Sequence, residues 1–241
     1  MIPEENVEFV KDSILSKRYS LILYESTRYI ITLVKFIKMI YKQMKPLPFR
    51  AWKKKYIPFA IDKETKEISG NYYVSSNWEK ILKMLKIINT KMPQIEVVVI
   101  DDMQYILSYE FVDRATEVGY QKFSELAQHL MEILRYAEQM REDCTMCFLT
   151  HSENVGTEID PKYVIKTVGK LLAEKVTLEG LFTYMFCTKI EEGEDGKMQY
   201  KLITNNDGKC LAKTPMGMFD ELEIDNDLNE IIKAIKAYDE E

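Results

Sequence analysis

The distribution of apolar residues along the chain predicts strands that alternate with helices. The most apolar stretch is Ile95 to Asp102, I-E-V-V-V-I-D-D, in which five of the first six residues are β-branched and two carboxylates close the run. Such a run is typical of a strand buried on both faces of a parallel sheet. Ligands bind beyond the carboxyl ends of these strands, so Asp101 and Asp102 are candidate functional residues. The alternative is a strand that simply ends in a polar turn.

The remaining pattern predicts one α/β domain. Helices are predicted at 6–17, 32–44, from the Ser76-x-x-Glu79 capping box onward, over 111–140 with a break near Gly119, and at 227–238. Strands are predicted at 19–24, 56–62, 71–75, 145–150, 181–190 and 198–204, the last two forming a hairpin. Segments 63–70 and 153–180 are predicted as a turn and a long polar loop. Because no repeat, linker or second core is visible, we predict a single domain over residues 1–241.

Composition and charge narrow the classes of function. The net charge of −6 argues against a general coat for duplex DNA, although the basic, aromatic segment 45–55 could contact a strand locally. No apolar run approaches the ~20 residues that span a bilayer, and the first residues lack the features of a signal peptide. We therefore expect a cytoplasmic protein that has no membrane partner. Cys144 and Cys147 form a C-x-x-C, but alternation along a strand would place them on opposite faces, against zinc or redox use.

Several segments, taken in order, resemble those of a known family. They are the strand, loop and helix at 19–44, I-D-K-E at 61–64, V-V-V-I-D-D at 97–102, F-V-D-R-A-T-E-V-G-Y-Q-K-F at 111–123, F-L-T-H-S-E at 148–153, V-G-K-L-L at 168–172, and T-N-N-D…A-K-T-P-M-G-M-F at 204–219. Together they cover most of the chain. The set resembles the small phage-encoded RecA-like recombination ATPases of the single-strand-annealing type, which are P-loop NTPases also described as AAA-domain phage nucleotide-binding proteins.

The resemblance implies a fold and a set of partners. The expected fold is α/β, a RecA-like P-loop NTPase core with a mostly parallel central sheet flanked by helices and a C-terminal β-hairpin. The expected cofactors are ATP and Mg²⁺, and the expected partner is single-stranded DNA. A homo-oligomer with nucleotide at its protomer interfaces, phage recombination or replication proteins as further partners, and the host cytoplasm as location follow from the same resemblance.

Four acidic or imidazole side chains acquire roles through this resemblance. Asp101 matches the Walker B acid that supports Mg²⁺, and the following Asp102 could orient water. Glu64 resembles the acid that positions the attacking water, the alternative being an exposed acid in a turn. His151 resembles the polar sensor that feels the γ-phosphate and signals to the DNA-binding loop, the alternative being a satisfied, partly buried histidine.

Three lysines acquire roles in the same way. Lys213, in A-K-T-P-M-G, resembles a lysine that reaches the nucleotide of a neighbouring protomer. Lys166 and Lys170 belong to the 153–180 segment, which stands at the place of the mobile DNA-contacting loop, so they are candidate phosphate contacts. A solvated loop is the alternative for this pair.

The chain departs from the family where the Walker A loop, G-x-x-x-x-G-K-S/T, is expected. The aligned window 25–32 is E-S-T-R-Y-I-I-T, in which only Thr32 matches, as a hydroxyl ligand of Mg²⁺. Glu25 and Ile30 replace the glycines that let backbone N–H groups face phosphate, and Ile31 replaces the lysine. Hydrogen bonds to such a charged group are worth about 1.5–3 kcal/mol each. We therefore expect nucleotide binding to be weak or absent.

Two functional hypotheses follow. Ser26, Thr27 and Arg28 remain candidate cofactor-binding residues of this loop, with Arg28 as a replacement cation. In the first hypothesis the chain binds ATP and acts on single-stranded DNA in recombination or replication, with hydrolysis doubtful because of the loop. In the second it is a non-catalytic, structural or regulatory protein of the same fold. The classification as an ATPase comes from the resemblance alone.

Overall fold

The computed structural model describes residues 20–25, 59–65 and 67–240 of the 241-residue chain. The described elements, in chain order, are β1 (Ser20–Glu25), β2 (Ala60–Ile61), β3 (Ile68–Ser69), α4 (Trp78–Lys91), β4 (Val97–Ile100), α5 (Met103–Asp113), α6 (Gln121–Ala137), β5 (Thr145–Asn154), β6 (Tyr163–Ile165), η1 (Leu171–Lys175), η2 (Leu178–Leu181), β7 (Tyr184–Glu192), β8 (Met198–Ile203), β9 (Glu223–Asp225) and α7 (Leu228–Glu240). The helices predicted at 6–17 and 32–44 and the basic segment 45–55 lie outside the described residues.

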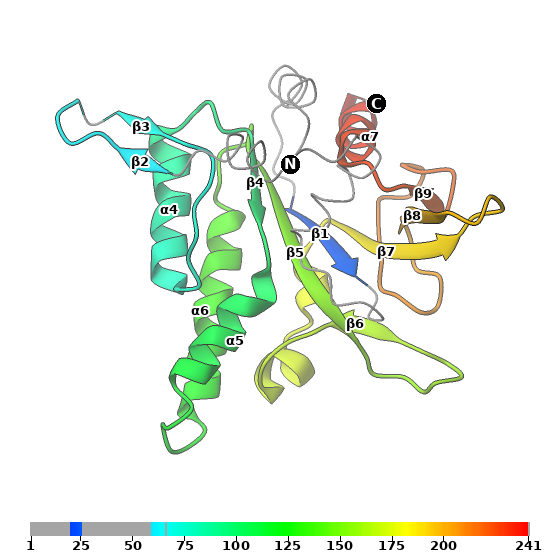
Figure 1. Cartoon of the computed structure of the whole chain (residues 1–241), viewed down its shortest axis with the longest axis horizontal. Helices are drawn as coiled ribbons and strands as arrows, with labels where there is room; N and C mark the ends of the chain where they lie inside the picture. The colour runs from blue at the N-terminus through cyan, green and yellow to red at the C-terminus, as the bar shows by residue number, and fades with distance from the viewer. Residues whose placement is uncertain (1–19, 26–58, 66, 241) are drawn as a thin grey trace.

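A seven-stranded mixed sheet organises the fold (Figure 1). Its strand order is β4-β5-β1-β7-β8-β9, and β6 pairs with β5 outside this path. Strands β4, β5, β1 and β7 run parallel to one another, whereas β6, β8 and β9 pair antiparallel with their neighbours. Ile100 at the end of β4 lies level with Phe148, and Glu25 at the end of β1 lies level with His151 and Thr188. These pairings bring the carboxyl ends of the parallel strands to one edge of the sheet.

The predicted RecA-like core with a mostly parallel central sheet is wrong for the described part of the chain. Three of the strand pairings in the sheet are parallel and three are antiparallel, so the sheet is mixed and its parallel part is limited to four strands. The predicted burial of the Ile95 to Asp102 strand on both faces is also wrong. Strand β4 lies at the edge of the sheet, and Val99 keeps 45% of its surface exposed. A run of β-branched residues does not reveal how many neighbours its strand has.

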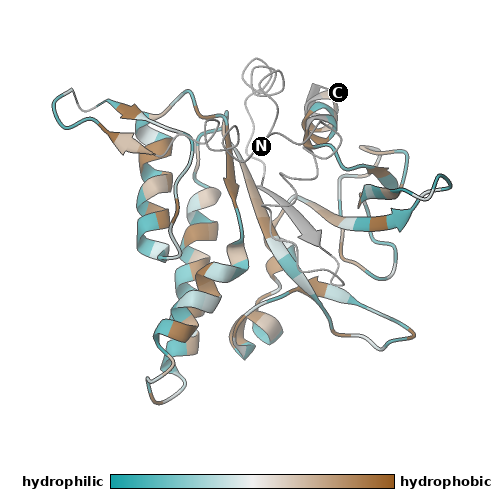
Figure 2. Cartoon of the chain, viewed as in Figure 1, coloured by the Kyte–Doolittle hydropathy of each residue, from teal (hydrophilic) through white to brown (hydrophobic). Residues whose placement is uncertain are grey.

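Helices cover both faces of the sheet, because successive side chains of β5 point to opposite faces and both sets are apolar. Met146 and Phe148 belong to a large apolar cluster that includes residues of α4, α5 and α6, whereas Cys147 and Leu149 belong to a second cluster with the buried face of α7. Figure 2 shows polar and apolar residues alternating along α4 and α6, as expected of helices with one buried side. None of the described helices is both long and apolar enough to span a bilayer.

The predicted placement of Cys144 and Cys147 on opposite faces is confirmed by the same alternation. Cys144 packs in the first cluster and Cys147 in the second, so the two thiols of the C-x-x-C lie on opposite sides of the sheet. Burial raises the pKa of Cys144 to about 11 and that of Cys147 to about 12. Both side chains therefore stay protonated and serve as small apolar packing groups.

Several sequence-based elements are confirmed and others are corrected. The strand at 19–24, the break near Gly119, the hairpin of β7 and β8, and the final helix appear as β1, the α5–α6 loop, an antiparallel pair and α7. No strand forms at 71–75; instead β3 lies in the predicted turn and pairs with β2. The segment 153–180 is not one loop, because β5 continues to Asn154 and β6 returns beside it. Helix α5 and strand β9 were not predicted.

The start of α4 also differs from the predicted capping box. Asn77, not Ser76, is the N-cap residue: its backbone is extended, and its side-chain oxygen accepts a hydrogen bond from the N–H of Lys80 at 3.0 Å. This contact satisfies one of the N–H groups that the first turn of a helix leaves without a partner.

Replacing the cap tests this assignment. Asn77→Ala should lower the free energy of unfolding by about 0.5–2 kcal/mol, because the Lys80 N–H loses its acceptor. The adjacent variant Ser76→Ala is the matched control and should change it by much less. Urea denaturation of both variants measures the difference. A larger loss for Ser76→Ala would restore the sequence-based capping box.

Candidate functional site

The site is built around a contact between Asp102 and His151. Nε2 of His151 lies 2.6 Å from Oδ2 of Asp102, and the two side chains are only 8% and 14% exposed, the carboxylate being the more buried. An ionised carboxylate can only accept hydrogen bonds, so in this contact Nε2 carries the hydrogen and donates a hydrogen bond to Asp102. The second oxygen of Asp102 accepts from the N–H of Gln104 at 3.2 Å, so Asp102 is also the N-cap of α5. Asp102 thereby connects the end of β4, the start of α5 and the end of the parallel part of β5.

Asp101 is the more accessible of the two adjacent acids. The residue as a whole is exposed. Desolvation by the surrounding protein, helped by the negative charge of Asp102 and opposed by His151, raises the pKa of Asp101 to about 7. The direction of the shift does not rest on burial alone, because the neighbouring carboxylate acts in the same sense. A cation near Asp101 would favour its charged form.

Lys166 is brought beside this pair by the β5–β6 pairing. Ser152 is paired with Ile165, and the N–H of Lys166 donates to the carbonyl of His151 at 2.9 Å. Lys166 therefore stands directly opposite His151, and side chains of opposed residues project from the same face of an antiparallel pair. Its side chain is exposed. The backbone pairing thus places an exposed lysine across from the histidine that Asp102 holds.

Glu64 does not join this cluster. It lies in the turn between β2 and β3, where its N–H donates to Oδ1 of Asp62 at 2.8 Å, and its side chain is exposed. Figure 1 shows this hairpin at the far left, beyond α4 and away from the carboxyl ends of β4 and β5. The predicted role in positioning water is therefore not supported within one copy of the chain. The alternative of an exposed acid in a turn describes its surroundings.

Lys213 is also separated from the cluster. Its N–H and carbonyl bond to the carbonyl and N–H of Met185 at 2.9 and 2.8 Å, which places its segment beside β7. Three strand spacings of about 4.8 Å separate this segment from β5, or roughly 14 Å. Met185 moreover lies level with Phe148, three residues before His151. Within one copy of the chain, Lys213 therefore lies apart from the Asp102–His151 cluster.

The other predicted residues have different outcomes. Lys170 is exposed and directly precedes the π-helical turn η1, with no described contact to Asp102 or His151. The side chains of Ser26, Thr27, Arg28 and Thr32 lie outside the described residues, so the predicted loop contacts and the predicted metal ligand Thr32 stay predictions.

Three residues near the cluster were not predicted. The ring of Tyr105, on α5, packs edge-on against His151 with centroids 6.0 Å apart. Oε1 of Gln104 and Oγ1 of Thr188 are buried and have no hydrogen-bond partner among the described residues. Thr188 lies level with Glu25, which lies level with His151. No sequence motif marks these positions. To find them from the sequence, one would have to know where α5 begins and how β7 is aligned with β1.

The cluster contains one accessible carboxylate that a metal ion could use. Buried polar atoms without partners, such as those of Gln104 and Thr188, favour a polar ligand or water at this edge of the sheet. Among the described residues no group of three or more acidic, histidine or cysteine side chains is arranged around a metal position. Mg²⁺ in nucleotide sites commonly takes one or two carboxylates and completes its shell with phosphate oxygens and water. Asp101 can supply such a carboxylate, and Lys166 can supply positive charge.

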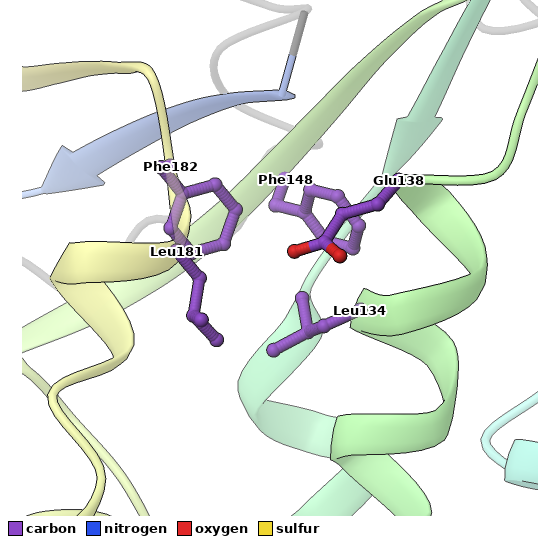
Figure 3. Close-up of a pocket in the computed structure, with 5 residues that line it drawn as sticks. All are labelled: Leu134, Glu138, Phe148, Leu181 and Phe182. Carbon is purple, nitrogen blue, oxygen red and sulfur yellow. The ribbon is translucent and has the colours of Figure 1, made fainter. Parts of the chain in front are cut away.

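The pocket in Figure 3 is a separate feature. It is lined by Leu134, Glu138, Phe148, Leu181 and Phe182, which come from α6, β5 and the η2 region, and it shares no residue with the Asp102–His151 cluster. Phe148 and Phe182 meet edge to face with centroids 5.5 Å apart. Its walls are apolar except for the Glu138 carboxylate, so it lacks the donors and cations that phosphate groups require.

Comparison with known proteins does not assign the chain to a family. No protein-family model matches the chain, and no curated protein matches it. Function is therefore inferred from the chemistry of the site itself.

The pKa of Asp101 predicts how stability depends on pH. Because the folded chain holds this proton more tightly than the unfolded chain, the free energy of unfolding contributed by Asp101 is greatest below pH 3.8 and falls as pH rises to about 7. In metal-free buffer, Asp101→Asn should gain stability relative to the natural chain across this window, as measured by urea denaturation.

Asp62 provides the contrast for this measurement. The N–H groups of Thr65 and Glu64 lower the pKa of Asp62, so its carboxyl titrates below its ordinary range in the folded chain. Asp62→Asn should therefore leave the slope between about pH 5 and 7 unchanged. An equal slope in the natural chain and in Asp101→Asn would contradict the environment described for Asp101.

Proposed function

We propose that this chain binds ATP with Mg²⁺ at the carboxyl edge of its parallel strands and couples that binding to single-stranded DNA. The observation that carries the proposal is the convergence of Asp101, Asp102, His151 and Lys166 at one edge of the sheet. An accessible acid, a held imidazole and an exposed cation are the groups that a metal–phosphate ligand needs. A cytoplasmic location and a homo-oligomer that brings Lys213 to a neighbouring site belong to the same proposal.

Each residue has a distinct part in this proposal. Asp101 would hold Mg²⁺ together with phosphate oxygens, and the metal would neutralise charge on the phosphate. Asp102 is a positioning residue, because its oxygens are engaged by Gln104 and His151. His151 keeps its ring oriented towards this edge. Its carbonyl accepts a hydrogen bond from the N–H of Lys166, so a shift of His151 would act on the end of β6 and on the segment proposed to contact DNA.

The engagement of Asp102 favours binding over hydrolysis. Neither Asp102 nor the remote Glu64 is placed to take a proton from an attacking water in one copy of the chain. We therefore expect hydrolysis well below the ~1 s⁻¹ of an ordinary enzyme. The non-catalytic, regulatory hypothesis is the second candidate, and it is favoured by this same observation.

Nucleotide binding tests the proposal. Because the Walker A window is altered, titration with a fluorescent, slowly hydrolysed ATP analogue and Mg²⁺ should give weak but saturable binding. Asp101→Asn should weaken it by roughly tenfold or more, since a charged metal ligand is removed. Asp113→Asn, at an exposed acid at the far end of α5, is the matched control and should bind normally. In EDTA the two variants should become equal. No binding at millimolar nucleotide would overturn the proposal.

Binding to DNA has its own test. Lys166→Ala should weaken binding to a single-stranded oligonucleotide at low salt, because one phosphate is no longer neutralised. The slope of log K against log salt should fall in magnitude by about 0.7 for each such phosphate. Lys197→Ala, at an exposed lysine in the β7–β8 turn, is the matched control. A slope that is equal in both variants would remove Lys166 from the DNA site.

A further inference from the structure

Two exposed tyrosines extend the site along α5. Tyr105 and Tyr109 are one helical turn apart, so their rings project from the same side of the helix, with centroids 5.6 Å apart. They are 37% and 53% exposed. Single exposed aromatic rings are common at protein surfaces, but two rings side by side form a flat apolar surface with polar hydroxyl tips.

Lys166 lies close to this aromatic pair along the backbone. Tyr105 packs edge-on against His151 at 6.0 Å, and Lys166 stands opposite His151 on the neighbouring strand. The order along the surface is therefore Tyr109, Tyr105, His151, Lys166. Aromatic faces beside a cation are the two components from which single-strand binding sites are made, because bases stack on rings while lysine meets phosphate.

We propose that Tyr105 and Tyr109 form a base-stacking platform for single-stranded DNA, with Lys166 contacting the adjacent phosphate. The inference rests on the proposed function and assigns the bases to α5, a helix that none of the sequence motifs connected with DNA. The charges indicate the side on which the phosphates lie. Asp113 is exposed one turn beyond Tyr109 and would repel phosphate; with Asp101 neutralised by Mg²⁺, the sugar–phosphate backbone is expected on the Lys166 side.

The platform adjoins the proposed nucleotide site through the contact between Tyr105 and His151. A base stacked on Tyr105 restricts that ring, and the ring borders the imidazole that Asp102 holds. DNA on the platform and nucleotide at Asp101 therefore share one intervening residue, His151. Coupling between the two ligands is expected to be reciprocal, since each must change the affinity for the other by the same factor.

The experiment compares two oligonucleotides of about twelve nucleotides, a size within the range that single-strand sites cover. One is oligo-dT and the other is an abasic strand of equal length and charge. Fluorescence anisotropy at low salt should show oligo-dT binding the natural chain roughly tenfold or more tightly than the abasic strand, because only the former can stack. Tyr105→Leu and Tyr109→Leu should reduce that ratio towards one, and Tyr105→Phe should keep it.

Tyr120→Leu is the matched control, since Tyr120 is 88% exposed in the α5–α6 loop and lies outside the platform; it should retain the full ratio. Equal binding of both strands by the natural chain would overturn the platform and leave DNA binding intact. An unchanged ratio in both leucine variants would also overturn it. Failure of the natural chain to bind either strand would overturn the DNA part of the proposed function and the platform with it.

Discussion

The contact between Asp102 and His151 holds the candidate site together. One carboxylate oxygen caps α5 and the other binds the imidazole on β5, so a single side chain fixes a strand end, a helix start and a neighbouring strand. Such a pair is stable at low exposure because each partner satisfies the other; an isolated buried carboxylate would be costly. The position of Lys166 then follows from the carbonyl of the same histidine. Removing either partner would disturb all three elements at once.

The sequence predicted the residues of this site better than their arrangement. Strong periodicity and β-branched runs gave β1, β5, the β7–β8 hairpin, α6 and α7, because these elements bury one clear face or one continuous run. Asp102 at the predicted strand tip and the separately chosen His151 lie in direct contact, a proximity that the sequence had not indicated. No local sequence pattern predicted that β5 continues to Asn154 and pairs with β6. This pairing places Lys166 opposite His151.

The errors have related physical causes. The apolar run before Asp101 was taken for a central strand, but strand position depends on pairing between distant segments, and β4 became an edge. The sheet is mixed because β6, β8 and β9 pair antiparallel with their neighbours. No local sequence pattern predicts the direction of these pairings. Glu64 lies away from the site because it belongs to the turn of a small hairpin, in which β2 and β3 pair with each other. Tyr105 was overlooked because α5 has no marked polar side from which a helix could be predicted.

The proposed nucleotide site beside Asp101 and His151 can be tested directly, because the chain has two histidines at different distances from it. Mn²⁺ in place of Mg²⁺, added with ATP, broadens proton NMR signals steeply with proximity. His151 touches Asp102, whereas His129 contacts Glu110, eight residues along α5 and thus about 12 Å farther up the helix. We predict that the ring signals of His151 broaden at low Mn²⁺–ATP while those of His129 stay sharp. Broadening of neither histidine, or of both equally, would contradict the account.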